Sequence, residues 1–248
     1  MLKKHYFFDL DNTLTPSKSL IEEAHVPILR ALCERADVIV VSGHGEKDIR
    51  KHLRPELEGN YYILGQNGNR AVTKDGTVLW NNSLLDNQKK AVVAFIEWAR
   101  EELRRNGTVT SVKDENDIVE DRDSQIAFSL IGHHEDKAKK DAFDPDFMKR
   151  RAILAGAVLN KEMEKLTSAG VEARIGGTTN IDFFRLGKNK GYNVAAFIEK
   201  MGWNKDDCIY IGDALFPGGN DDTVNGVIPT RGVKEYRETY EYLSSIMH

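Results

Sequence analysis

Short, uninterrupted apolar runs limit the fold of this chain more than any other feature. HYFF occupies residues 5–8, and DVIVVSG occupies residues 37–43. Runs of this length are typical of strands that are buried on both faces, as the strands of parallel sheets are. Helical patterns alternate with such runs over the first third of the chain, and the connections are short. This order predicts a parallel sheet covered by helices.

The end of the chain returns to the same alternation. KGYNVAAFIEKMGW (190–203) is predicted as a helix and DCIYIGD (207–213) as a buried strand. GVIPT (226–230) is a further candidate strand. The two ends of the chain therefore have the pattern of one α/β domain.

The middle of the chain has a different pattern. Long helices are predicted over residues 87–105 and from 144 to 170. Between them, apolar residues alternate over residues 126–130, which is typical of a sheet with one solvated face. The sequence therefore predicts an α/β fold, a Rossmann-like doubly wound parallel sheet interrupted by an inserted α+β module. We expect the core to span 1–84 and 184–248 and the inserted cap to span 85–183.

Composition excludes several classes of protein. A net charge of −4 and a pI near 6.0 give no support for nucleic-acid binding. No segment approaches the ~18 continuous apolar residues of a membrane span, and the N-terminus runs into a strand rather than a signal peptide. Cys33 and Cys208 lie in apolar segments and are expected to be free thiols, which favours a reducing cytoplasm. The run Lys149-Arg150-Arg151 is expected to be a solvent-facing patch.

Three predicted strands end in polar residues. The first ends in Asp9 and Asp11, the second in Ser42-Gly43, and the strand at 207–213 in Asp213. Ligands of doubly wound sheets collect beyond the carboxyl ends of the strands, so these carboxylates are expected to converge. Mg²⁺ would relieve their repulsion, because it takes carboxylate and water oxygens as ligands. The alternative is a strand-end turn in which Asp9 and Asp11 cap backbone amides.

These motifs resemble those of the haloacid dehalogenase superfamily of Mg²⁺-dependent phosphotransferases. FFDLDNTLT is similar to its first motif, VVSG to its second, Lys190 in KNKG to its third, and IGDALFPGGND to its fourth. The fourth motif is similar, down to loop length, to that of eukaryotic-type phosphomannomutases and related sugar phosphatases. The resemblance covers essentially the whole chain and implies a cap of type IIB.

The resemblance assigns roles to the site residues. It implies that Asp9 is the nucleophile that carries an aspartyl-phosphate and that Asp11 is the general acid and base, retaining a proton beside its ionised neighbour. Mg²⁺ would bind the Asp9 carboxylate, the Asp11 backbone carbonyl and the Asp213 carboxylate. Asp221 would complete the metal site, and with Asn220 it would orient Lys190 or Mg²⁺-bound water. The phosphate-binding residues would be Ser42, the amide of Gly43, Lys190 and Asn220. Ser42 is also read as a turn serine, and Lys188 competes with Lys190 for the third-motif position.

The inserted module bears on the reaction. Phosphomannomutases hold a second phosphate with arginines, but this chain has Lys18, His133 and Lys140 at three of those positions, and Asn180 replaces a serine. Arg122 and Asp182 match, and these two residues and His133 are the expected substrate-binding residues of the inserted module. Since lysine and histidine lack the bidentate grip of arginine, water is expected to take the phosphoryl group. We therefore expect a phosphatase acting on a small phosphorylated metabolite, a sugar phosphate; a phosphohexomutase and a non-catalytic sugar-phosphate sensor are the alternatives.

One apolar stripe in the inserted module has two interpretations. Phe95, Ile96, Ala99 and Leu103 recur at helical spacing. They form either the core of the module or a homodimer surface between two caps. The sequence does not separate these two interpretations.

Overall fold

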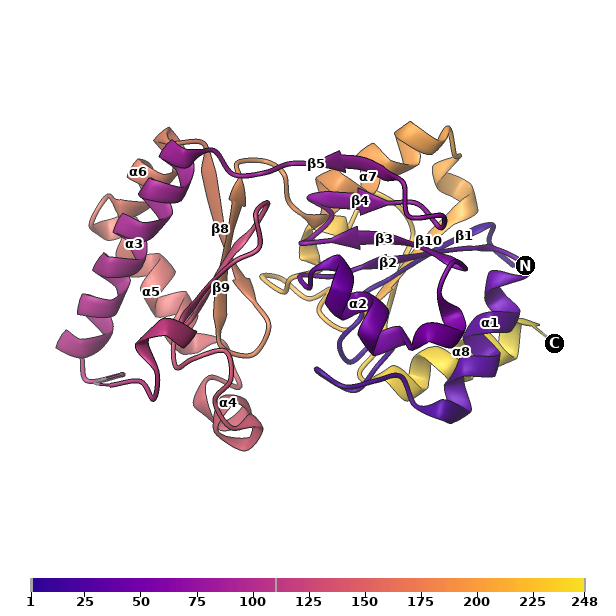
Figure 1. Cartoon of the computed structure of the whole chain (residues 1–248), viewed down its shortest axis with the longest axis horizontal. Helices are drawn as coiled ribbons and strands as arrows, with labels where there is room; N and C mark the ends of the chain where they lie inside the picture. Colours follow the sequence, from indigo (N-terminus) through magenta and orange to yellow (C-terminus); the bar gives the residue numbers. More distant parts are fainter. Residues whose placement is uncertain (1, 110, 248) are drawn as a thin grey trace. The chain divides into compact units, whose positions relative to one another are not determined.

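The computed structural model describes residues 2–109 and 111–247. It divides into two compact units (Figure 1). The core unit contains Met1–Asn81 and Asn189–His248, and the inserted unit contains Asn82–Lys188. These borders lie a few residues from the predicted ones at 84/85 and 183/184.

The core unit contains a seven-stranded sheet in the order β11-β10-β1-β2-β3-β4-β5. The first five strands in this order run parallel, whereas β4 and β5 extend the edge antiparallel as a hairpin. The chain runs outward from β1 through β2 and β3 and returns to the other side of β1 through β10, so the predicted doubly wound α/β fold is confirmed. The strands are β1 (His5–Phe8), β2 (Asp37–Val41), β3 (Tyr61–Gly65), β4 (Arg70–Val72), β5 (Val78–Asn81), β10 (Cys208–Gly212) and β11 (Thr230–Gly232).

Helices cover both faces of this sheet because successive strand residues point to opposite sides. Tyr6 and Phe8 pack with α1 (Val26–Cys33), α2 (Glu46–Leu53) and α8 (Tyr236–Met247). Phe7, between them, packs with α7 (Lys190–Met201) on the other face. The strands are therefore buried on both sides, as their continuous apolar runs predict.

The inserted unit has a four-stranded antiparallel sheet in the order β6-β7-β9-β8. Helices α3, α5 and α6 supply buried apolar residues that pack on one face of this sheet, and Phe143 at the end of α4 packs against the same cluster. The strands are β6 (Val119–Asp121), β7 (Ile126–Ser129), β8 (Val171–Gly176) and β9 (Asn180–Arg185). The helices are α3 (Asp86–Arg105), α4 (Lys137–Phe143), α5 (Met148–Leu159) and α6 (Glu162–Ser168).

One expectation for the inserted unit is wrong, and another holds only in part. The second long helix is two helices, because Lys161 takes a left-handed conformation (φ 62°) between α5 and α6. The face of the sheet away from the helices is solvated only in part, because all four residues of β7 are buried whereas Arg174 of β8 is exposed. A buried polar side chain on β7 is paired within the unit, as in the 3.0 Å hydrogen bond between the hydroxyls of Ser129 and Thr179.

The basic run on α5 also differs from its predicted role. Arg150 is fully buried instead of facing solvent. Its Nε donates to Asp144 Oδ2 at 2.6 Å, and its Nη1 donates to the carbonyl oxygens of Gly176 and Gly177 at 2.9 and 2.7 Å. The basic run did not predict the burial of Arg150, because its acidic partner and the two carbonyl groups are brought to it only by the tertiary structure.

The apolar stripe on α3 belongs to the core of the inserted unit. Phe95, Ile96, Ala99 and Leu103 are all buried there against residues of the sheet and of α5 and α6. The stripe is therefore part of the core, which was the first of its two interpretations. A homodimer through the cap stays a prediction, without this stripe as its surface.

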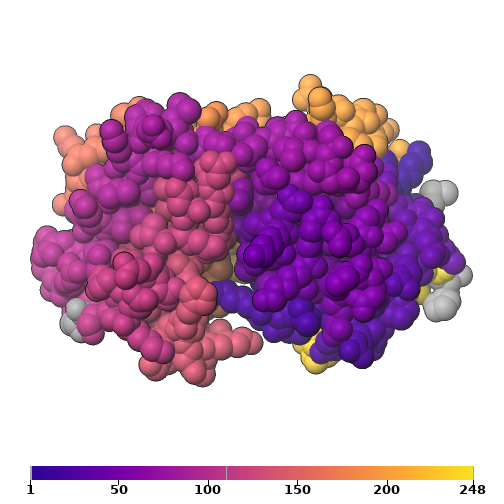
Figure 2. Space-filling view, viewed as in Figure 1, coloured from indigo at the N-terminus to yellow at the C-terminus, as the bar shows by residue number. Residues whose placement is uncertain are grey.

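The surface of the core unit in the space-filling view comes largely from the indigo and purple N-terminal segment (Figure 2). Both cysteines, Cys33 and Cys208, are free thiols. Within residues 2–109 and 111–247, no helix combines the length and apolar composition needed to cross a bilayer.

Candidate active site

The candidate site lies at the carboxyl ends of the central parallel strands. Because β1 pairs with both β10 and β2, the residues that follow these strands become neighbours. Asp9 follows β1 and donates its backbone N–H to Ile211 of β10 at 2.9 Å. Ser42 follows β2 and donates its N–H to Leu64 of β3 at 3.0 Å. The backbone ladder thus continues one residue past the strands and fixes both positions.

A buried lysine connects two carboxylates at this edge. Lys190 is only 2% exposed, and its Nζ donates to Asp9 Oδ1 at 2.8 Å and to Asp221 Oδ1 at 2.6 Å. It is the first residue of α7, where the Asn189 side chain caps the helix by accepting from Tyr192 N–H at 3.0 Å. Burial alone would lower the pKa of Lys190, but the negative charges of Asp221 and Asp9 outweigh it and raise this pKa. Lys190 is therefore charged, and it occupies the place predicted in preference to Lys188.

Three carboxylates gather around this lysine. Oxygens of Asp9, Asp213 and Asp221 all lie within 4.8 Å of one another. Burial raises the pKa of Asp9 well above its usual range; Lys190 opposes this shift, and Asp221 and Asp213 add to it. Burial first, and the charge of Asp221 second, raise the pKa of Asp213 to about 6. The convergence of Asp9 and Asp213 expected from the strand ends is present.

This group fits a hard divalent cation. If ionised, the three carboxylates exceed the single positive charge of Lys190 by two. Asn220, next to Asp221, has a buried Oδ1 with no hydrogen-bond partner among the described residues, and such an oxygen suits a cation-bound water. Carboxylate and amide oxygens with waters are the ligand set that Mg²⁺ prefers. Asp9 and Asp213 are the better direct ligands, because Asp221 already accepts from Lys190 and Tyr210.

Tyr210 is a site residue that the sequence did not reveal. Its buried hydroxyl donates to Asp221 Oδ1 at 2.6 Å. Asp221 also lies so close to Gly212 that a Cβ there would come within 2.3 Å of Asp221 Oδ2. Tyr210 occupies an apolar strand run, where an aromatic side chain is read as core, so no local signal marks its hydroxyl.

Asp11 is arranged differently from the other carboxylates. Its side chain is not part of the three-carboxylate group: Oδ2 lies 2.9 Å from His44 Nε2, and Oδ1 accepts from the backbone N–H of Lys18 at 2.5 Å. Burial raises the pKa of Asp11, but the hydrogen bond and charge of His44 outweigh it and lower this pKa. The protonated Asp11 expected beside an ionised Asp9 stays a prediction. The predicted contact of its backbone carbonyl with Mg²⁺ stays a prediction.

The loop after β2 carries Ser42, Gly43 and His44. The Ser42 hydroxyl accepts from His44 N–H at 3.1 Å, so the hydroxyl proton can point to another acceptor, as a phosphate-binding role requires. Gly43 lies between these two residues. Sequence reasoning missed His44, although its position just past a predicted strand end was a usable signal.

Arg122, His133 and Asp182 gather in the inserted unit. Glu120, Ala127 and Asp182 are direct cross-strand neighbours on β6, β7 and β9. Arg122 Nη2 lies 2.5 Å from Glu120 Oε2, and His133 Nδ1 lies 3.8 Å from the same oxygen. His133 Nε2 is 3.2 Å from the carbonyl oxygen of Ala127. One row of the sheet thus brings the three predicted residues together.

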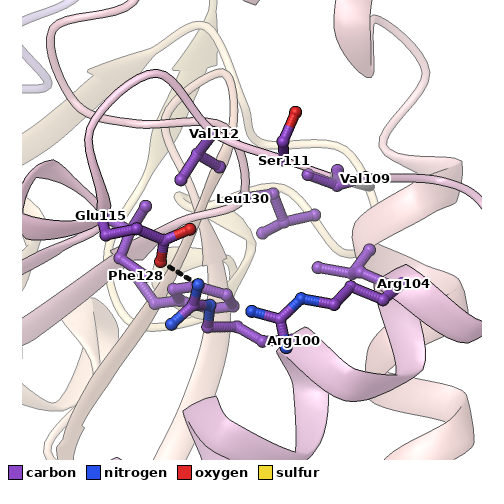
Figure 3. A pocket seen from close by; sticks show the side chains of 10 residues that line it. Arg100, Arg104, Val109, Ser111, Val112, Glu115, Phe128 and Leu130 are labelled. Atoms are coloured by element: carbon purple, nitrogen blue, oxygen red, sulfur yellow. Dashed lines mark hydrogen bonds and ion pairs between the residues drawn. The ribbon is translucent and has the colours of Figure 1, made fainter.

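A separate small pocket lies inside the inserted unit. Figure 3 shows it between α3 and the residues Val109, Ser111, Val112 and Glu115, with Arg100 paired to Glu115. Its volume of about 20 Å³ suits a water molecule but not a sugar phosphate. The pocket does not compete with the carboxylate group as a candidate active site.

Comparisons with known proteins agree with this geometry. Residues 6–216 match the model of the haloacid dehalogenase-like hydrolase family. The chain is 26% identical to phosphomannomutase 1 of Dictyostelium discoideum over 224 residues, covering 86% of this chain and 83% of that protein.

Solved structures share the fold. An IMP-nucleotidase of Plasmodium falciparum superposes with a TM-score of 0.67 at 16% identity, covering 100% of this chain and 71% of the other. A trehalose-6-phosphate phosphatase related protein superposes with a TM-score of 0.55 at 16% identity, covering 98% and 96%. At these identities the likeness shows the fold alone. The family match spans most of the sequence, and the chain belongs to the haloacid dehalogenase-like hydrolases.

Proposed function

We propose that the protein is a Mg²⁺-dependent phosphatase that hydrolyses a small phosphorylated metabolite of the sugar-phosphate class. The observation that carries this proposal is the buried Lys190 bridging Asp9 and Asp221 beside Asp213. The carboxyl ends of the central strands then carry a nucleophile, a fixed positive charge and an oxygen-rich cation site. These are the parts that phosphoryl transfer needs.

Asp9 would attack the phosphorus atom and hold it as an aspartyl-phosphate. Lys190 neutralises one Asp9 oxygen and keeps the carboxylate in a single orientation. Bound to Asp9 and Asp213, Mg²⁺ would supply positive charge against the transferring phosphoryl group. Ser42 and the amide of Gly43 would donate hydrogen bonds to phosphoryl oxygens.

Asp11 would protonate the leaving oxygen and then take a proton from the attacking water. Its two hydrogen-bonded oxygens stabilise the carboxylate that remains after the first transfer. A second lone-pair position on each oxygen is available to the reacting groups. The same residue therefore serves both half-reactions.

The inserted unit supports hydrolysis over mutase chemistry. Its candidate cations are engaged or neutral: Arg122 pairs with Glu120, Lys140 donates to the His133 carbonyl, and burial lowers the pKa of His133 and so favours the neutral ring. A mutase must hold a second phosphate while the bisphosphate turns around, and arginine forks do this best. We propose that Arg122, His133 and Asp182 instead select the non-transferring part of one substrate.

A phosphohexomutase is the second candidate, and the matched relative named a phosphomannomutase favours it. A sugar-phosphate sensor without catalysis is a third, although the complete set of reactive groups argues against it. A reducing, cytoplasmic location stays a prediction that the free thiols of Cys33 and Cys208 favour.

One assay separates these candidates. The full chain with Mg²⁺ is offered a panel of hexose, pentose and nucleoside monophosphates, with and without a hexose bisphosphate primer. Release of inorganic phosphate without primer is the expected result. Primer-dependent isomerisation would replace the proposal with a mutase, and binding without turnover would replace it with a sensor.

A further inference from the structure

His44 holds the carboxylate of Asp11 from a different segment of the chain. His44 follows β2, whereas Asp11 follows β1, and His44 Nε2 lies 2.9 Å from Asp11 Oδ2. The backbone N–H of Lys18 engages the other oxygen at 2.5 Å. Two donors from two segments therefore leave the carboxylate little freedom to rotate.

His44 is itself held in place without help from Asp11. Its N–H donates to the Ser42 hydroxyl at 3.1 Å, and its carbonyl oxygen accepts from Gln66 N–H at 2.9 Å. Its ring, whose side chain is 18% exposed, packs edge-on against the ring of His52 at 5.1 Å between centroids. A side chain fixed at its backbone and behind its ring can act as a rigid support.

The loop between Asp11 and Lys18 is also shaped around this carboxylate. Lys18 has a left-handed backbone (φ 53°), which is uncommon for a residue other than glycine. Its N–H points at Asp11, and Asp11 and Thr15 form an isolated backbone bridge. The left-handed backbone of Lys18 and the contact with His44 therefore both serve to hold the Asp11 side chain.

We infer that His44 is a positioning residue that aims the Asp11 carboxyl group at the leaving oxygen of the substrate. The inference rests on the proposed function and adds a residue to its site. As a bond forms between an Asp9 oxygen and phosphorus, the phosphorus–oxygen ester bond breaks, the Asp11 O–H bond breaks and a new O–H bond forms on the leaving oxygen. Asp11 remains as a carboxylate that accepts hydrogen bonds from His44 Nε2–H and Lys18 N–H. In the second step the water oxygen bonds to phosphorus, the bond between Asp9 and phosphorus breaks, and a proton of the water passes to Asp11.

This role makes the effect of His44 depend on the leaving group. An alkoxide-like sugar oxygen needs a proton in the transition state, whereas a nitrophenolate leaves without one. Proton transfer of this kind contributes roughly 10²–10⁴-fold to rate. Loss of the support should therefore slow sugar-phosphate hydrolysis far more than p-nitrophenyl phosphate hydrolysis.

The test compares kcat and KM of the wild type, His44→Ala, His44→Gln and the exposed control His134→Gln on both esters. For a hexose 6-phosphate, we expect kcat of His44→Ala to fall about 100-fold with little change in KM. With p-nitrophenyl phosphate the fall should stay below about fivefold. His44→Gln, which keeps an N–H donor, should recover much of the loss, and the control should match the wild type. Thermal unfolding checks that each variant is folded.

Each other outcome overturns the assignment. An equal fall on both esters would mean that His44 only maintains the loop, and no fall on either would mean that Asp11 needs no support. If His44→Ala does not fold, the ratio of the two rates in His44→Gln decides in the same way. A wild type that hydrolyses neither ester would instead end the proposed function, and the assignment with it.

Discussion

Lys190 Nζ lies 2.8 Å from Asp9 Oδ1, although the two residues are 181 positions apart in the sequence. Both side chains are almost fully buried. The pair joins the first strand of the core unit to the first helix after the insertion, so the two halves of the core unit meet at the proposed nucleophile.

Replacing this lysine should remove activity. In Lys190→Met, Asp9 and Asp221 lose their shared positive charge, so we expect kcat to fall at least about 100-fold, as for loss of one preorganised electrostatic group. Lys200→Met, on the exposed side of the same helix, is the matched control. Steady-state kinetics on the best substrate measures both, and near-normal kcat in Lys190→Met would contradict the assignment.

Asp9→Asn should abolish turnover and phosphoenzyme formation together. An amide cannot form the acyl phosphate, whereas a role confined to metal binding would leave a weakened but real reaction at high Mg²⁺. Intact-mass analysis after rapid acid quench should show an added phosphoryl group in the wild type and none in the variant. Asp206→Asn, which is exposed just before β10 and so at the end of that strand away from the site, serves as control. A phosphorylated Asp9→Asn protein would place the nucleophile elsewhere.

The sequence was informative where chemistry follows directly from strand position. The ends of β1 and β10 placed Asp9 and Asp213 at one edge, and the continuous apolar runs predicted the parallel sheet. Residues whose role depends on a distant partner were missed. The sequence predicts Tyr210 to be a core residue, and only its hydrogen bond to Asp221 shows its role in the site. The sequence predicts Arg150 to lie at the surface, but it is buried against Asp144 and two carbonyl groups.

The pKa of Asp213, raised to about 6, predicts how pH affects stability without metal. A carboxyl group whose pKa is higher in the folded than in the unfolded state lowers stability at pH above the folded value, and this cost disappears as pH falls toward the unfolded value. In EDTA, Asp213→Asn should therefore be more stable than the wild type at pH 7.5, and the gap should narrow at pH 5. Urea unfolding of both proteins at both pH values measures this difference in the free energy of unfolding.

Addition of Mg²⁺ should make the wild type more stable than Asp213→Asn. A cation that binds only the folded protein stabilises it by about 2.7 kcal/mol at one hundred times its Kd. The wild type should gain stability on addition of Mg²⁺, whereas Asp213→Asn should gain little. Equal stabilisation of both proteins would show that Asp213 is not a ligand.

Tyr210→Phe tests the support beneath Asp221. Removing a hydrogen bond to a charged, buried carboxylate should cost about 1.5–3 kcal/mol of unfolding free energy. Because Asp221 also orients Lys190, we expect kcat to fall with little change in KM. Tyr242→Phe, on α8, is the matched control. A variant with normal kcat would limit Tyr210 to stability.

Arg150→Met should destabilise the inserted unit. Asp144 would be left as an uncompensated buried charge, and two carbonyl oxygens would lose their donor, which costs about 3–5 kcal/mol when one partner of a buried pair is removed. Arg105→Met, at the exposed end of α3, should change stability little. Limited proteolysis should cut the Arg150→Met protein first between residues 82 and 188, because the lost contacts all belong to that unit. Cleavage that begins in the core unit, or unfolding free energies equal to those of the control, would show that the buried pair does not hold the inserted unit together.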